Sequence, residues 1–358
     1  MSTHLAPDLK DMRELMADTA SAWLRLSTFT QALLKTEIGQ LPENPDWLTN
    51  AHRALAENRD VGNRWHLKAP AIKAPIISAF IQYSSSFEAF VQLADITNDQ
   101  SAIDTMVSML QTLVDQIDGI LTSIHPSAHV MASIADDFAS VHTAMTQAAD
   151  AAKVANVENQ KALIKSAAAI AQLKQKIDDL SGDLKSDAIS GGETIIENQI
   201  ELIFESVAES GAIPILGTGL VIFSLIIDIV ETIEASVEIT EAIDELNEAM
   251  KEEALEVQTA IALQGVLVAF DRLNTLYIEA QQPGPKLALI WKEERDKLSL
   301  TIDALKSGAQ PTEMMALHQL ADAKSVWVKL SRFAQTLQTL EASQTAKATL
   351  KVSAKAKG

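Results

Sequence analysis

The sequence lacks cysteine altogether, so disulfide bridges, thiolate nucleophiles and thiolate metal ligands are excluded. Residues that interrupt helices or favour sheets are also few. Aromatic residues make up 4% of the 358 residues, with 13 glycines and 10 prolines. Alanine, leucine, glutamate and lysine, which are good helix formers, are abundant instead. We therefore expect an all-α protein.

Positive charge is scarce as well. The chain has 48 acidic and 29 basic residues, for a formal net charge of -19. Such a surface repels phosphate backbones, so no nucleic-acid partner is expected.

Sequence patterns of enzymes and cofactor sites are missing. Gly217-Thr218-Gly219 suggests a phosphate loop, but neither the third glycine nor a Gly-Lys-Ser/Thr ending follows, and a hinge fits its apolar flanks better. His125 and His129 are four residues apart and His142 follows, yet no glutamate stands at a zinc-protease position. No G-x-S-x-G elbow is present. We predict no enzyme activity, no metal and no cofactor.

Apolar residues recur at three- and four-residue steps through most of the chain, as in amphipathic helices. Pro126 is expected to interrupt or kink the chain, and the proline-containing segment 41–75 to form short helices and turns. Two long helices of similar length should pack antiparallel. The expected helices are Pro7–Ile38, Ile76–Ala94, Ser101–Ile124, Ala128–Leu184, Val230–Gln281, Lys286–Lys306 and Thr312–Leu340.

The longest apolar run is Gly211 to Val230, and no side chain from Gly211 to Ile227 carries a charge. A helix that is apolar on every side needs cover on every side, either in a protein core or in a membrane. The run is at the short end for crossing a bilayer, and Asp228 and Glu231 lie at its boundary. We interpret it as a conditional membrane segment.

Glutamates occupy every fourth position in the segment just before this run. On a helix they form one stripe, opposite an apolar face. This stripe is either a solvated face of a core helix or, next to the apolar run, the wet side of a membrane-inserted segment. The glutamates are Glu193, Glu197, Glu201, Glu205 and Glu209.

Gly191-Gly192, the glutamate stripe, the apolar run and the long helices on either side together resemble the cytolysin A-type α-helical pore-forming toxins. The resemblance implies an elongated bundle of about five long helices, with a small hydrophobic head inserted between two long antiparallel helices. It implies tail bundles at 1–188 and 232–341 and a head at 189–231. The lysines of residues 342–358 stand among Ser, Ala and Thr without an apolar face, so a disordered tail is expected there. This chain departs from the family pattern in one respect. A head that faces lipid on all sides would bear almost no glutamates, whereas this one carries five.

The resemblance together with a physical argument about the glutamates suggests roles for residues of the head. A ring of subunits with hydrated glutamates around its lumen would select cations. The expected pore-lining residues are the five glutamates of the stripe. The expected hinges are Gly191, Gly192, Gly211, Gly217 and Gly219. The expected membrane-inserting residues are Ile213, Ile215, Leu216, Leu220, Val221, Ile222, Phe223, Leu225, Ile226 and Ile227.

The implied function is that of a pore-forming cytolysin or enterotoxin subunit, soluble at first and then a homo-oligomer in a target-cell bilayer, with other toxin components. Residues 1–10 lack a basic region that leads into an apolar one, so secretion without a recognisable signal peptide is expected. The alternative is a non-enzymatic helical scaffold or interaction protein, whose apolar segment is a buried cap or a dimer interface.

Overall fold

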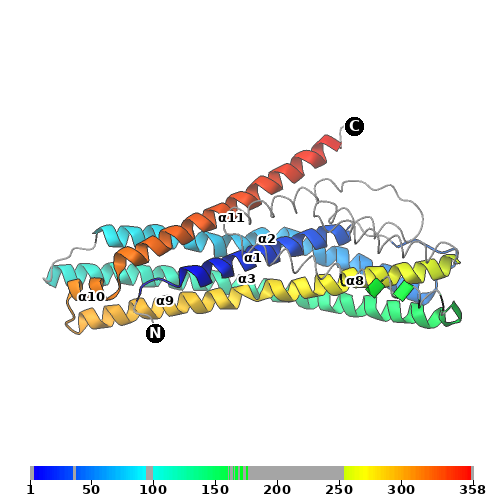
Figure 1. Cartoon of the computed structure of the whole chain (residues 1–358), viewed down its shortest axis with the longest axis horizontal. Coiled ribbons are helices and arrows are strands. Elements are labelled where there is room, and N and C mark those ends of the chain that lie inside the picture. Colours follow the sequence, from blue (N-terminus) through cyan, green and yellow to red (C-terminus); the bar gives the residue numbers. More distant parts are fainter. Residues whose placement is uncertain are drawn as a thin grey trace. The chain divides into compact units, whose positions relative to one another are not determined.

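The structure is a computed structural model that describes residues 4–34, 38–93, 100–159, isolated positions between 161 and 175, and 254–355. All regular elements in these ranges are helices, so the all-α prediction is confirmed. Figure 1 labels them. They are α1 Leu9–Leu34, α2 Asp46–Leu93, α3 Gln100–Ala155, the 3-10 helix η1 Val157–Asn159, α8 Leu255–Gln281, α9 Pro283–Lys306, α10 Pro311–Leu317 and α11 Leu320–Lys355.

The chain divides into two compact units, and α2 and α3 contribute residues to both. The first unit comprises Met1–Ala20, Lys68–Met131 and Gln281–Glu341. The second unit comprises Ser21–Leu67, Ala132–Ala280 and Ala342–Gly358.

Prolines do not divide the helices where the sequence suggested. α2 continues through Pro70 and Pro75, and α3 continues through Pro126, so the expected turns and interruption are wrong. Pro70 and Pro126 are exposed and Pro75 is partly exposed. A proline in a helix leaves one carbonyl without its usual amide partner. On an outer face that carbonyl can be hydrated, and burial of the opposite face keeps the helix continuous.

Two helix ends also differ from expectation. The helix expected to reach Leu184 ends as α3 at Ala155, where the Asn156 side chain donates to the carbonyl of Ala152 over 2.9 Å. Asparagine competes with helical hydrogen bonding in this way and favours helix ends. At the other end of the chain, α11 continues to Lys355, although residues 342–358 were expected to be disordered.

The core of the first unit is an aromatic cluster from α2, α9 and α11. Trp291 and Trp327 stack with ring centroids 5.5 Å apart and an interplanar angle of 17°. Tyr83 meets the Trp327 ring edge-on at 4.5 Å. The Trp327 indole N–H donates to the carbonyl of Leu5 over 2.9 Å, so the residues before α1 belong to this core. Such ring pairs stabilise a core beyond the area they bury.

The second unit is built around α8. Every residue from Thr259 to Val266 is buried, so α8 is surrounded here rather than packed on one face. Gly62 of α2 allows α1 to come close, because a Cβ atom at that position would lie 2.8 Å from Cγ2 of Thr30. α8 is therefore a core helix of the second unit.

Candidate functional site

The described helices α3 and α8 are the parts of the chain that border residues 160–253, and their pairing is the geometry most relevant to function. The side-chain amide of Gln264 in α8 donates to the carbonyl of Ala149 in α3 over 2.9 Å. His142 precedes Ala149 by seven residues along α3, and Asp271 follows Gln264 by seven residues along α8. His142 Nε2 and Asp271 Oδ1 lie 2.7 Å apart. The matching steps in opposite directions define an antiparallel pair.

Aromatic rings fill the seam further along this pair. Phe138 of α3 lies 5.7 Å from Phe270 and 4.9 Å from Tyr277 of α8, measured between ring centroids. Burial raises the pKa of Tyr277 above its ordinary value, although a hydrogen bond with Thr30 and the charge of Arg64 oppose the shift. The tyrosine therefore stays neutral. The seam combines apolar packing with a few oriented polar contacts, which fixes one register.

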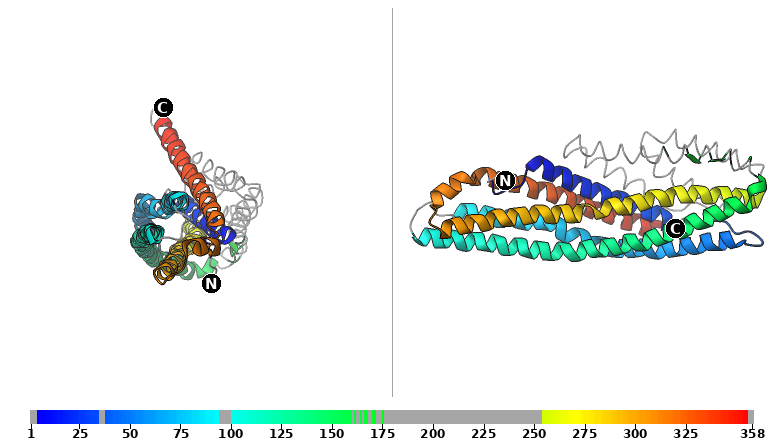
Figure 2. Two further views of the ribbon diagram at one scale, coloured as in Figure 1. Left: turned by 90° about the vertical axis from the view of Figure 1, so that its left-hand side faces the viewer. Right: turned by 90° about the horizontal axis from the view of Figure 1, so that it is seen from below.

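The pairing brings the end of α3 and the start of α8 to the same place. Figure 2 shows both at the same end of the second unit, with α3 in green and α8 in yellow. We call this end the base; it is formed by residues 149–159 and 254–264. Residues 160–253 leave α3 and return to α8 at the base. A segment attached in this way is inserted between two antiparallel helices.

One described helical stretch, Leu255–Lys306, is long and apolar enough by composition to cross a membrane. However, 72% of its most apolar window is buried inside the protein. The core helix of a soluble protein meets the same criterion, and the all-round burial of residues 259–266 fits that explanation. We assign this stretch to the core.

Glu294 of α9 is an ionisable side chain buried inside the first unit. Its side chain is 3% exposed, and the Lys297 ammonium lies 2.5 Å from its Oε1 atom. Burial raises the pKa of Glu294 to about 7, against the opposing effect of Lys297. The same ammonium donates to the carbonyl of Ala6 over 3.4 Å. Burial, followed by the charge of Glu294, also raises the pKa of Tyr83.

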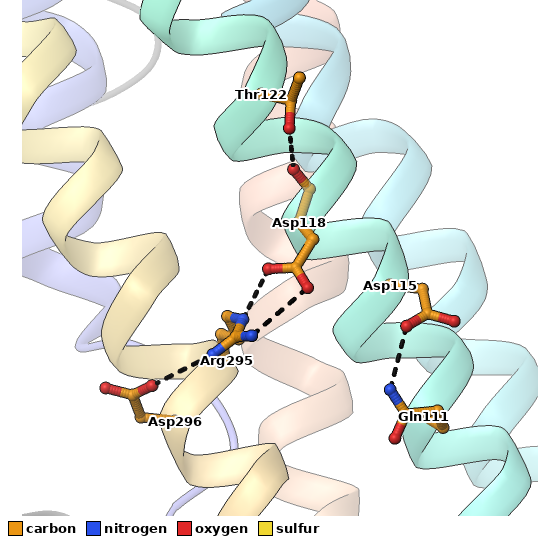
Figure 3. Close-up of polar contacts among 6 residues, drawn as sticks. All are labelled: Gln111, Asp115, Asp118, Thr122, Arg295 and Asp296. Carbon is orange, nitrogen blue, oxygen red and sulfur yellow. Dashed lines mark hydrogen bonds and ion pairs between the residues drawn. The ribbon is translucent and has the colours of Figure 1, made fainter.

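A second ion pair of the first unit lies nearer the solvent. Figure 3 shows Arg295 of α9 reaching Asp118 of α3, with Nε 2.6 Å from Oδ1 and Nη2 3.5 Å from Oδ2. The side chain of Asp118 raises the pKa of Arg295 by accepting these hydrogen bonds. Both side chains are more than a third exposed, so solvent screens the pair. It orients α9 against α3 more than it stabilises them.

Within the described ranges, no group of three His, Asp or Glu side chains could hold a metal ion. His125 and His129 are exposed on α3, and His142 contacts Asp271 instead of a metal.

Comparisons with solved structures identify the fold. The cytotoxin MakB from Vibrio cholerae is 19% identical over 94% of each chain, with a TM-score of 0.72. The HblL1 toxin component from Bacillus cereus is 16% identical, covering 94% of this chain and 97% of its own, with a TM-score of 0.58. This chain has the fold of the cytolysin A-type toxin components.

A third such structure is soluble SmhA of the tripartite α-pore-forming toxin Smh from Serratia marcescens. It is 11% identical and covers 95% of this chain and 96% of its own, with a TM-score of 0.66. No protein-family profile matches the sequence, and no curated protein matches it. The resemblance inferred from the sequence is therefore confirmed at the level of the fold. The structures are similar although the sequences share few identical residues.

The predicted site residues all lie outside the described residues. This applies to the ten membrane-inserting residues from Ile213 to Ile227, to the five glutamates from Glu193 to Glu209, and to the five glycines from Gly191 to Gly219. The head boundaries at 189 and 231 lie outside as well. These assignments stay predictions. What the structure adds is the base to which the segment is attached.

Sequence reasoning missed the buried carboxylate Glu294. A signal was available, because Trp291, Glu294 and Leu298 follow one another at steps of three and four residues on the buried face of α9. A charged residue at a core position of such a stripe predicts a shifted pKa. The Trp327 contact with Leu5 had no comparable signal, since the two residues are 322 positions apart.

Proposed function

We propose that this protein is a component of an α-pore-forming toxin. The observation that carries the proposal is the antiparallel α3–α8 pair, which holds both ends of residues 160–253 at the base. The apolar run and the glutamate stripe fall within that segment. A segment attached at two adjacent points can change its position without unfolding the helices that carry it.

In this proposal the head has a lipid-facing part and a water-facing part. Residues 212–227 contact the hydrocarbon, and the glutamates from Glu193 to Glu209 face the lumen of a ring of subunits. A lumen keeps each carboxylate hydrated, which lowers the cost of placing it at membrane depth. Gly191, Gly192, Gly211, Gly217 and Gly219 supply the backbone freedom that a change of conformation needs.

The protein acts by making a membrane permeable, so it catalyses no reaction and requires no cofactor. It is released from the producing cell in soluble form and acts at the membrane of a target cell. Partner components are part of the proposal, supported by the tripartite toxin Smh among the structures that share the fold. Oligomers of this chain with itself form on the membrane.

Release of a trapped dye from liposomes tests the proposal. The chain is assayed alone and with the products of the genes next to its own. We expect release that is abolished by Ile222→Asp together with Ile226→Asp, because two charges in the hydrocarbon are costly. Circular dichroism and solubility check that the variant folds. Failure of every combination to bind or permeabilise liposomes would contradict the proposal and favour a helical scaffold.

A further inference from the structure

Residues 4–8, which precede α1, contact α9 and α11 without forming a helix. We call them the strap. Leu5 and Ala6 are 2% and 3% exposed, so the strap belongs to the core of the first unit. The Trp327 indole N–H donates to the carbonyl of Leu5 over 2.9 Å, and the Lys297 ammonium donates to the carbonyl of Ala6 over 3.4 Å. Two side chains from different helices therefore hold successive carbonyls of the strap.

Lys297 connects the strap to the buried carboxyl group of Glu294. The same ammonium that donates to Ala6 lies 2.5 Å from Oε1 of Glu294. The side chains of Glu294 and Lys297 are 3% and 16% exposed, so the pair is largely shielded from water. Because Ala6 contacts Lys297 directly, departure of the strap would admit water to the pair.

Few titratable groups act on Glu294. Burial raises the pKa of Glu294 to about 7, Lys297 opposes the shift, and the charge of Glu293 adds to it. Tyr83 is the group that interacts with it from α2, and burial keeps this tyrosine neutral by raising its pKa. α11 contacts the strap through Trp327, which does not titrate. Protonation of Glu294 is therefore the main change of charge around the strap near neutral pH.

Binding of the strap and binding of this proton are linked. Water that reaches Glu294 when the strap departs would lower its pKa towards the ordinary value of 4.5. The state with the strap in place therefore binds the proton more tightly than the state without it. By reciprocity, a protonated Glu294 favours the bound strap, and an ionised Glu294 favours its departure.

We propose that the strap is a pH-dependent clasp, closed on α9 and α11 while Glu294 is protonated and opened more often once Glu294 is ionised. Opening uncovers Trp327 and Lys297. The proposal goes beyond the toxin function and does not depend on it, because every residue involved belongs to the first unit. Residues 160–253 take no part in it.

The reactivity of one buried thiol tests the proposal. Because the chain has no cysteine, Leu5→Cys places a single thiol in the strap, where it reacts with a water-soluble reagent only after opening. The rate is divided by that of an unstructured peptide with the same cysteine at the same pH, which gives the opening equilibrium. We expect opening to be about tenfold more frequent at pH 8 than at pH 5, since tenfold corresponds to one pKa unit.

Substitutions in the Leu5→Cys chain identify the group responsible. Glu294→Gln should abolish the pH dependence of opening, because glutamine stays neutral. Asp303→Asn, an exposed change on α9, should preserve it. His4→Gln and Asp8→Asn should also preserve it, although both residues belong to the strap. A pH dependence that survives Glu294→Gln, or one that disappears with His4→Gln or Asp8→Asn, would overturn the proposal.

A thiol elsewhere in the core separates opening of the strap from opening of the whole unit. Ala323 of α11 is 0% exposed, and Ala323→Cys should react more slowly than Leu5→Cys at both pH values. Ala6→Cys gives a second position in the strap and should show the same pH dependence as Leu5→Cys. Equal rates at positions 5, 6 and 323 would overturn the proposal, since the strap would then not open by itself.

The outcome is independent of the liposome assay. If the chain permeabilises no vesicle but the strap opens as expected, only the toxin function is contradicted. If the chain permeabilises vesicles and the corrected thiol rates do not change with pH, only the clasp is overturned.

Discussion

Gln264 of α8 donates its side-chain amide to the backbone carbonyl of Ala149 in α3, over 2.9 Å in the buried interior of the second unit. Gln264 lies within a stretch of α8 that is buried on all sides. A buried amide without a partner is costly, so sliding one helix along the other would be penalised. This contact sets the register that brings the end of α3 beside the start of α8.

The first prediction concerns that contact. Gln264→Leu keeps a similar volume but removes the donor, and we expect a loss of about 1 kcal/mol in the free energy of unfolding. Faster hydrogen exchange in peptides from the α3–α8 seam would localise the effect. Gln147→Leu is the control, because Gln147 is exposed on α3. Equal changes in the free energy of unfolding for the two substitutions would show that the buried hydrogen bond of Gln264 does not stabilise the protein.

The second prediction is a pH dependence due to Glu294. Its pKa is about 7 in the folded protein and 4.5 ordinarily, so the folded state binds the proton more tightly. The resulting stabilisation is fully present below about pH 4.5 and is lost as the pH rises through 7. Its size is on the order of 3 kcal/mol, since one pKa unit corresponds to about 1.4 kcal/mol.

Chemical denaturation at pH 5 and pH 8 measures this effect. Glu294→Gln should remove the corresponding part of the pH dependence, because the glutamine stays neutral throughout. Asp303→Asn should leave it nearly unchanged, since Asp303 is exposed on α9 and does not contribute to the raised pKa of Glu294. An unaltered pH dependence in Glu294→Gln would contradict the assignment.

The third prediction compares two helical glycines. A Cβ atom at Gly62 would lie 2.8 Å from Thr30 Cγ2 and 2.9 Å from Leu34 Cδ2, whereas one at Gly119 meets nothing within 4 Å. Gly119→Ala should stabilise the protein by about 0.5–1 kcal/mol through helix propensity. Gly62→Ala should destabilise it, because overpacking costs about 1–3 kcal/mol. Thermal unfolding distinguishes the two substitutions. A higher melting temperature for Gly62→Ala would contradict the prediction, because α1 would then have moved aside at little cost.

The fourth prediction concerns the glutamate stripe. Conductance through planar bilayers should be cation-selective, and Glu201→Gln with Glu205→Gln should reduce that selectivity, because rings of carboxylates attract cations. Glu158→Gln, an exposed change in η1, should have no effect. Unchanged selectivity in the double variant would remove these glutamates from the lumen.

Much of the fold follows from local patterns. α1 and α9 lie close to the ranges that the apolar periodicity predicted, because one face of each is buried and the other is solvated. The antiparallel pairing of the helices around the head was also predictable, since a chain that leaves and returns through two long helices has few other arrangements. The prolines of α2 and α3 were misread because their effect depends on which face of the helix they occupy.

The candidate site was predictable only in part. The apolar run and the glutamate stripe are visible in the sequence as patterns, whereas the base is not. The position of the base depends on where α3 ends, and the contact of Asn156 with the carbonyl of Ala152 marks that end.

By itself, the sequence determined the all-helical class, the absence of thiol chemistry and the charge asymmetry, because composition and periodicity act within one turn or along one face. The tertiary structure decided the register of Gln264 against Ala149 and the burial of Glu294 beside Lys297. These properties depend on contacts between residues far apart in the chain, whose free energies are fixed only when the helices are packed together.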